Sequence, residues 1–193
     1  MELHPAVARA AEGVLPPWAV MTAERRAHAA RVARLLDDWA RALEVDEAER
    51  ARFRAAGILH DALRDECGDA LRPRVVPALA ELPDALLHGP AAAERLRIDG
   101  VEDGELLRAV AYHSLGHPRF GRLARALYAA DFLEPGRDLL DGWREALRAR
   151  MPGDLDGVVR EILGARIAHL VEKGSPLRAE TTGLWNALVA EGS

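Results

Sequence analysis

The spacing of apolar residues is the strongest constraint on what this chain can fold into. Between Thr22 and Glu44, apolar side chains recur at steps of three and four residues, at Val32, Leu35, Leu36, Trp39 and Leu43. This period matches one face of an α-helix, and it dominates the rest of the chain. No segment of any length alternates apolar and polar residues as a half-buried β-strand does. The sequence therefore predicts an all-α fold.

Capping residues and prolines mark the expected helices. Thr22 and Asp46 suit the N-caps of the first two long helices, and we expect the second to run through His60 to Leu63. Further helices are expected at 84–87, from about 88, from 103 or 104 to about 116, at 121–132 and at 155–173, with a short helix near the C-terminus. Prolines break the stretch between 71 and 83 into a loop with a short helix. The residues before Thr22 are expected to form a loose segment, in which "EGVLPPW" suggests a turn between a short helix and the main body.

Length and charge narrow the class of protein. At 193 residues the chain suits one domain over 1–193, with a core over about 22–135 and C-terminal helices over about 155–190 packed on it. The net charge of −5 argues against coating nucleic acid, and the single cysteine, Cys67, excludes both an intramolecular disulfide and a thiolate metal cluster. Neither a membrane-spanning apolar run nor a signal peptide is recognisable. We expect a soluble, cytoplasmic protein that binds neither nucleic acid nor membrane.

Several potential metal ligands lie on helix faces that the apolar pattern turns inward. Those in register with the apolar stripe of their own predicted helix are His28, His60, His113 and Asp131. Each one alone is more often an ordinary hydrogen-bonded core residue. Burying a polar group without a partner costs about 2–7 kcal/mol, however, and four such groups would need four separate local partners. A shared metal ion satisfies all of them together, so the joint pattern predicts a metal site.

The order of these residues resembles a known superfamily. A distant His, an adjacent His-Asp pair and a later Asp form the minimal signature of the HD-domain metal-dependent phosphohydrolases. This chain matches that signature with His28, His60-Asp61 and Asp131. His88 and His113 stand between them, as in the version of the domain that holds a second metal. The resemblance implies a compact helical HD domain with a buried metal centre.

Longer blocks of sequence resemble one bacterial subfamily more closely. These blocks are "ERRAHAARVARLL", "AGILHDALRDE", "LLHGPAAAERL", "AVAYHSLGHP" and "LYAADFLEPGRD", followed by the tail "LVEKGSPLRAETTGLWN". They are similar, over roughly Thr22 to Leu188, to the YqeK-like symmetrical diadenosine tetraphosphate hydrolases. The resemblance implies an enzyme that cleaves a small nucleotide substrate, diadenosine tetraphosphate, at its centre into two ADP molecules.

The resemblance also implies how two metal ions would be held. One ion would take His28, His60, Asp61 and Asp131, and the other would take His88 and His113, with the two oxygens of Asp61 bridging the pair. Nitrogen and oxygen ligands without sulfur suit iron, manganese or similar ions, and the family favours iron. A hydroxide shared by the two ions would attack phosphorus in line, with no covalent protein nucleophile.

Three further residues are candidates for contacting the substrate. Arg64 follows His60 by four residues and stands where the family usually has lysine; we expect it to stabilise phosphate charge, with a surface ion pair as the alternative. His117 is a candidate phosphate contact or proton donor, and an exposed loop position is the alternative. Arg137 is expected at the mouth of the pocket, where it would meet a distal phosphate unless it forms a local salt bridge. The catalytic set suggested in this way is Asp61, Arg64 and His117.

The ligand set by itself leaves other functions open. Another HD phosphohydrolase, acting on a nucleoside mono- or triphosphate or on a guanosine alarmone, would use the same metal ligands. A non-catalytic nucleotide-binding module could keep the fold and bind nucleotide without turnover. A di-iron oxidase fits less well, because Arg64 and Arg137 suit phosphate. The sequence leaves the oligomeric state open, a homodimer included.

Overall fold

Every regular element in the described part of this computed structural model, residues 3–136 and 141–191, is helical. The α-helices are α1 (Pro5–Ala11), α2 (Ala23–Ala42), α3 (Glu47–Leu59), α4 (Gly68–Leu71), α5 (His88–Ile98), α6 (Gly104–Tyr112), α7 (Arg122–Leu133), α8 (Asp141–Arg150), α9 (Leu155–Glu172) and α10 (Ala179–Glu191). Short 3-10 helices cover η1 (Arg72–Arg74), η2 (Pro77–Leu79) and η3 (Asp84–Leu86). The predicted all-α class is confirmed.

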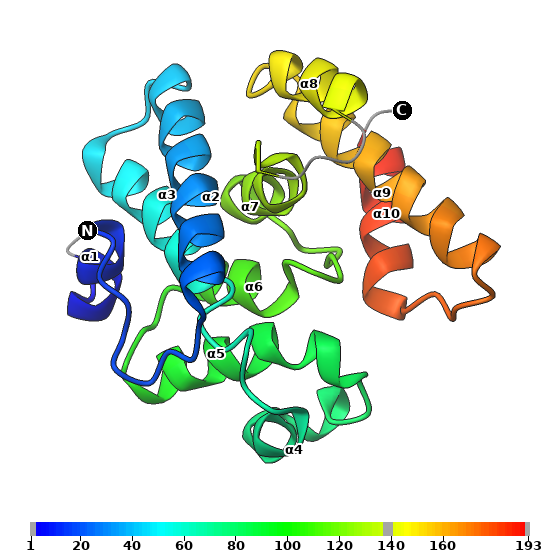
Figure 1. The fold of residues 1–193 in the computed structure, drawn as a ribbon. Coiled ribbons are helices and arrows are strands. Elements are labelled where there is room, and N and C mark those ends of the chain that lie inside the picture. Colours follow the sequence, from blue (N-terminus) through cyan, green and yellow to red (C-terminus); the bar gives the residue numbers. More distant parts are fainter. Residues whose placement is uncertain (1–2, 137–140, 192–193) are drawn as a thin grey trace.

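Three helices form the centre of the molecule. α2 and α3 run side by side, and α7 packs against both of them (Figure 1). The pair α5 and α6 lies next to this centre, with α6 in contact with α7, and α9 packs on α7 from the other side and carries α10 (Figure 1). One cluster of buried apolar side chains extends from Val7 in α1 to Leu188 in α10. None of the helices described is both long and apolar enough to cross a bilayer.

The predicted capping residues start their helices. Thr22 Oγ1 accepts a hydrogen bond from the Arg25 amide at 3.3 Å at the start of α2. Asp46 caps α3 in the same way, through the Glu49 amide at 2.8 Å. Each of these bonds satisfies one of the amide groups that the first turn of a helix leaves unpaired.

Two helices end earlier than the sequence pattern predicted. α3 stops at Leu59 rather than near Leu63, and α6 stops at Tyr112 rather than near residue 116. In each case the next residue is a histidine. The Nδ1 atom of His60 lies 2.8 Å from the Gly57 carbonyl oxygen, and that of His113 lies 2.9 Å from the equivalent carbonyl three residues earlier. In a continuing helix this carbonyl would accept a hydrogen bond from a backbone amide. The imidazole bonds it instead, and the helix ends there.

The N-terminal region and α8 also differ from expectation. The segment before Thr22 is not loose, because α1 packs on α3 with Val7 and Ala10 buried, and the Arg54 side chain of α3 donates to the Ala11 carbonyl at 3.3 Å. α8 was not predicted. Its sequence, "DGWREALRAR", is strongly charged, and its apolar face is short, with Trp143 and Leu147 as the only large apolar side chains, so the apolar pattern did not stand out.

Two glycines allow close approach between the helices that carry histidines. A Cβ on Gly57 of α3 would lie 2.5 Å from the Cα atom of Ala33 in α2. A Cβ on Gly89 of α5 would lie 2.8 Å from the Val110 carbonyl oxygen of α6. Both obstacles are backbone atoms, which cannot turn away as a side chain can. The backbones of α2 and α3, and those of α5 and α6, therefore meet at distances that only glycine permits.

Gly57→Ala is expected to destabilise the protein by about 1–3 kcal/mol or more, because the added methyl group forces α2 and α3 apart. Alanine is intrinsically the better helix former, so the sign of the effect tests the close approach itself. Urea denaturation would measure the change. The matched control is Gly142→Ala near the start of α8, where a Cβ meets nothing within 4 Å, so stability should be unchanged or raised by up to about 1 kcal/mol. Equal stabilities of the two variants would contradict the prediction.

Candidate metal centre

Imidazole and carboxylate side chains from five helices converge at the centre of the molecule. α2 contributes from its second turn, α3 and α6 from the residues just after their last turns, α5 from its first residue and α7 from near its end. The residues brought together in this way are His28, His60, Asp61, His88, His113 and Asp131. All of them are buried except Asp131, which is half-buried. These are the six residues that the sequence predicted as ligands.

The Asp61 carboxylate divides the cluster into two groups. Its Oδ2 atom lies 3.6 Å from His60 Nε2 and 3.9 Å from His28 Nε2. Its Oδ1 atom lies 3.1 Å from His88 Nε2 and 3.5 Å from His113 Nε2. Each oxygen therefore faces a different pair of imidazoles.

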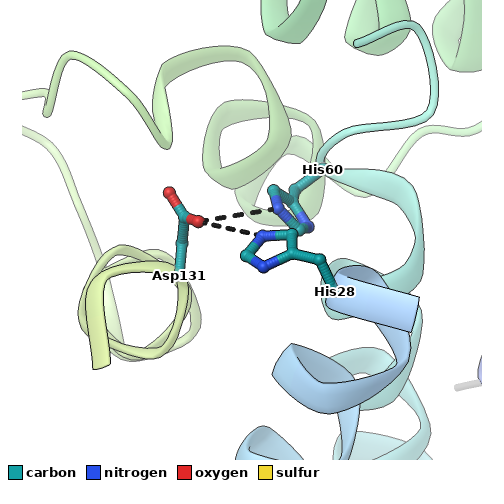
Figure 2. A group of neighbouring side chains, drawn as sticks. All are labelled: His28, His60 and Asp131. Carbon is teal, nitrogen blue, oxygen red and sulfur yellow. Dashed lines mark ion pairs between the residues drawn. The ribbon is translucent and has the colours of Figure 1, made fainter. Parts of the chain in front are cut away.

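Asp131 belongs to the first of these groups. Its Oδ1 atom lies 3.2 Å from His28 Nε2 and 3.9 Å from His60 Nε2. Figure 2 shows the carboxylate reaching from α7 towards the two imidazoles, which come from α2 and the end of α3. The three side chains hold their ligand atoms close enough together for one metal ion. A second such group is formed by His60, Asp61 and His113.

The imidazoles present their Nε2 atoms to the centre. The Nδ1 atoms of His60 and His113 are bonded to backbone carbonyls, and that of His28 lies 3.3 Å from Glu134 Oε1. A ring that donates from Nδ1 keeps the Nε2 lone pair for a metal. The Nε2 atoms of His28 and His60 are buried without a hydrogen bond. Such orphaned acceptors, aimed at a shared carboxylate, are the donor set that a divalent metal ion requires.

The electrostatic surroundings also favour a cation. Burial lowers the pKa of His60 to about 4, which keeps its ring in the neutral form that can bind metal. Burial alone would raise the pKa of Asp61, but the surrounding imidazoles, His60 first, hold it well below its usual range. The C-termini of α3 and α6 end at the cluster, and the negative ends of their helix dipoles add to the attraction for positive charge.

Five of the six residues, all but His60, line a cavity of about 600 Å³ that arginine side chains also line. Arg64 is one of them, and its Nη1 atom donates to the Ala85 carbonyl at 3.0 Å. The other arginines of the lining are Arg25, Arg31 and Arg166. The structure therefore places Arg64 in the same cavity as the predicted ligands, in a turn beyond the end of α3 rather than on the helix.

His117, another predicted substrate contact, does not line this cavity. His117 lines a separate groove with Tyr112, and its Nδ1 atom accepts the Arg119 amide at 3.0 Å. The cause is the early end of α6 and the turn at Gly116, whose φ of 83° directs the chain away from the helix axis. Arg137 lies outside the described residues.

Sequence reasoning missed a carboxylate behind His28. Glu134 is buried, and besides its contact with His28 it accepts hydrogen bonds from Arg31 Nε at 2.6 Å and from the Gly136 amide at 2.9 Å. When a carboxylate accepts a hydrogen bond from the second ring nitrogen of a metal-binding histidine, it fixes the orientation of that ring. The spacing of His28 and Arg31 could have indicated such a carboxylate, because the two residues share one face of α2 and can contact the same partner.

Glu134→Gln is expected to weaken metal binding about 10-fold or more, the usual effect of replacing the partner of a ligand histidine. The amide cannot accept both the His28 and the Arg31 hydrogen bonds with the geometry of the carboxylate. Titration of the metal-free protein with manganese, followed by calorimetry, would measure the affinity. Glu24→Gln is the control, because Glu24 is an exposed residue of the same cavity. Equal affinities would show that Glu134 does not position His28.

The fold and the cluster define a class of protein. Residues 25–136 match the family model of the HD domain, which covers more than half of the chain and includes all six residues of the cluster. The chain therefore belongs to the HD-domain phosphohydrolase superfamily. The C-terminal helices α8, α9 and α10 follow the matched region.

The chain is also similar to several relatives over two thirds or more of its length. The chain is 28% identical over 150 residues to the symmetrical bis(5'-nucleosyl)-tetraphosphatase of Halalkalibacterium halodurans, covering 75% of this chain and 79% of that protein. The protein of the same name from Staphylococcus aureus is 28% identical over 138 residues, covering 67% and 70%. A crystal structure of a predicted HD superfamily hydrolase involved in NAD metabolism, from Clostridium acetobutylicum, has a TM-score of 0.78 over 89% of this chain and 92% of that one. At 23% identity that structure supports the fold alone.

Proposed function

We propose that this protein is a metal-dependent hydrolase that cleaves dinucleoside tetraphosphates symmetrically, with diadenosine tetraphosphate giving two ADP molecules. The observation that carries the proposal is the position of Asp61, between two pairs of imidazoles at the floor of a cavity lined by arginines. The relatives with this activity support the choice of substrate.

Two metal ions fit the two sides of Asp61. The ion on the Oδ2 side would be held by His28, His60, Asp61 and Asp131, and the ion on the Oδ1 side by Asp61, His88 and His113. When bound, two such ions supply an activated water and offset the charge of the phosphoryl oxygens. The donor set contains nitrogen and oxygen without sulfur, which suits iron, manganese or similar ions. The family resemblance makes iron our first choice among them.

The chain must also position the polyphosphate of the substrate next to the His/Asp cluster. Arg64 lines the cavity and donates to the Ala85 carbonyl, and a guanidinium there can contact two phosphate oxygens at once. Arg64 therefore acts in charge stabilisation and not as a proton donor, since its guanidinium stays charged at neutral pH. A cut at the centre of the tetraphosphate requires the two middle phosphates to lie at the cluster and a nucleoside to extend on each side.

Product analysis tests the proposal. The metal-loaded protein is incubated with diadenosine tetraphosphate in ¹⁸O-labelled water, and the products are separated and analysed by mass spectrometry. ADP as the only nucleotide product, with the label in half of the ADP molecules, is the expected result, because water attacks one of the two central phosphates. ATP with AMP would contradict the symmetrical cut. Binding without turnover, with either iron or manganese, would favour the nucleotide-binding module, and turnover of a nucleoside triphosphate or a guanosine alarmone alone would favour another HD phosphohydrolase.

A further inference from the structure

A second chamber adjoins the cavity of the metal centre. Its volume is about 270 Å³, and Leu86, Ser114 and Arg166 line both spaces. Ser114 directly follows His113, so the chamber begins one residue away from the candidate ligands. The rest of its lining comes from Pro83, from Leu115 in the turn after α6, from α7, from the end of α9, from the loop that follows α9 and from the start of α10.

Arg166 of α9 stands where the two spaces meet. Its Nη2 atom donates to the Ser114 carbonyl at 2.8 Å, and its guanidinium carbon lies 5.3 Å from the centre of the buried Tyr128 ring. Arg31 and Arg25 of the same cavity have carboxylate partners, in Glu134 and Asp65. Within residues 3–136 and 141–191, Arg166 makes no ion pair with a carboxylate. It is a half-buried, oriented cation whose charge is available to an anionic ligand.

The chemistry of the chamber indicates what it can hold. Its walls include the Tyr128 ring, Leu170 and Pro176, which suit a flat apolar group. Two arginines, Arg166 and Arg178, are in the lining, and no aspartate or glutamate is. A ligand with an apolar ring system and adjoining negative charge fits these walls. A nucleoside with its first phosphate has this composition.

We propose that the second chamber binds one nucleoside end of the substrate and that Arg166 contacts the phosphate next to that nucleoside. This inference rests on the proposed function, because it assumes a substrate that extends from the metal centre on both sides. The proposal assigns metal binding to one part of the chain and shares nucleoside binding between two parts. The HD-domain match over residues 25–136 supplies the metal centre and one wall of the chamber, including Ser114 and Tyr128. The part of the chain beyond the match, with α9 and the loop to α10, supplies Arg166 and the opposite wall.

Two variants of the metal-loaded protein test the site. Arg166→Met removes the cation, and Ser175→Trp, in the loop after α9, fills the chamber with an indole ring. Each is expected to raise the KM for diadenosine tetraphosphate about tenfold or more, the size expected for a lost charged hydrogen bond or a blocked site. The value of kcat and the metal content should change little, because neither residue belongs to the cluster. Arg160→Met, an exposed arginine on the same helix, is the matched control and should behave like the wild type.

Direct binding of ADP separates this inference from the proposed function. Calorimetry is expected to show that both variants bind ADP more weakly, or bind fewer molecules, than the wild type and Arg160→Met. Unchanged KM and unchanged ADP binding in a wild type that produces ADP would overturn the nucleoside site and leave the proposed function standing. If the wild type produces no ADP, the proposed function fails. The binding measurement then decides alone, since ADP binding that is unaffected by both variants overturns the site.

Discussion

Asp61→Ala is expected to release both metal ions and to abolish hydrolysis of the substrate. The two carboxylate oxygens face different pairs of imidazoles, so one substitution removes the shared ligand of both ions. It also removes the buried negative charge that offsets two cations within a low-dielectric core. Metal analysis of the purified variant and an assay for ADP release would measure the two losses. Circular dichroism would establish that the variant is folded.

Arg64→Ala is the control for this result. Arg64 lines the same cavity but contacts the Ala85 carbonyl rather than the cluster, so this variant should keep both metal ions and lose mainly rate or substrate affinity. A variant at Asp61 that still hydrolyses the substrate would show that the two-metal interpretation is wrong. If the Asp61→Ala protein kept one metal ion per molecule, the proposal that Asp61 bridges two ions would be contradicted.

Removal of the metal ions from the wild type is expected to cause the largest change in stability. Each ion that binds only the folded state adds about 4 kcal/mol when its free concentration is about 1,000 times Kd. For a chain of this length, 1 kcal/mol corresponds to about 2–4 °C in Tm, so the loss of even one ion should lower Tm by about 8–16 °C. The buried Nε2 atoms of His28 and His60, which have no hydrogen bond, explain why the metal-free centre is costly. Thermal unfolding with and without a chelator would measure the shift.

The Asp61→Ala protein provides the reference for the chelator experiment. Because it is expected to hold no metal, its Tm should not respond to the chelator. Re-addition of iron or manganese should restore both Tm and activity of the wild type, and the metal that restores both is the one the centre accepts. A wild-type Tm that does not change on chelation would contradict a metal centre that couples binding to folding.

Much of the site could be predicted because register within a helix is a local property. The three- and four-residue spacing placed His28 and Asp131 on the inner faces of their helices, and the structure brings them to 3.2 Å. The spacing also placed His60 and His113 inside. It could not show that these two end their helices, because an imidazole that bonds a carbonyl three residues earlier leaves no trace in apolar periodicity.

Other features depend on segments that are far apart in the sequence. His117 is four residues after His113, a spacing that would place both on one face of a continuous helix, but α6 ends before either of them. Glu134 meets Arg31 across more than a hundred residues, and Arg166 reaches Ser114 from α9. No local pattern specifies such contacts, because they result from how the helices pack.

By itself the sequence determined the helical class, the starts of the long helices and the ordered series of histidines and aspartates that point inward. Only the tertiary structure decided that the two oxygens of Asp61 face different imidazole pairs, that Glu134 supports His28, and that α9 adds Arg166 to the cavity wall. The physical reason is that periodicity specifies which face of each helix is buried but not which helices meet there. Their meeting depends on close backbone contacts, such as that of Gly57 with Ala33, which form only when the whole core packs.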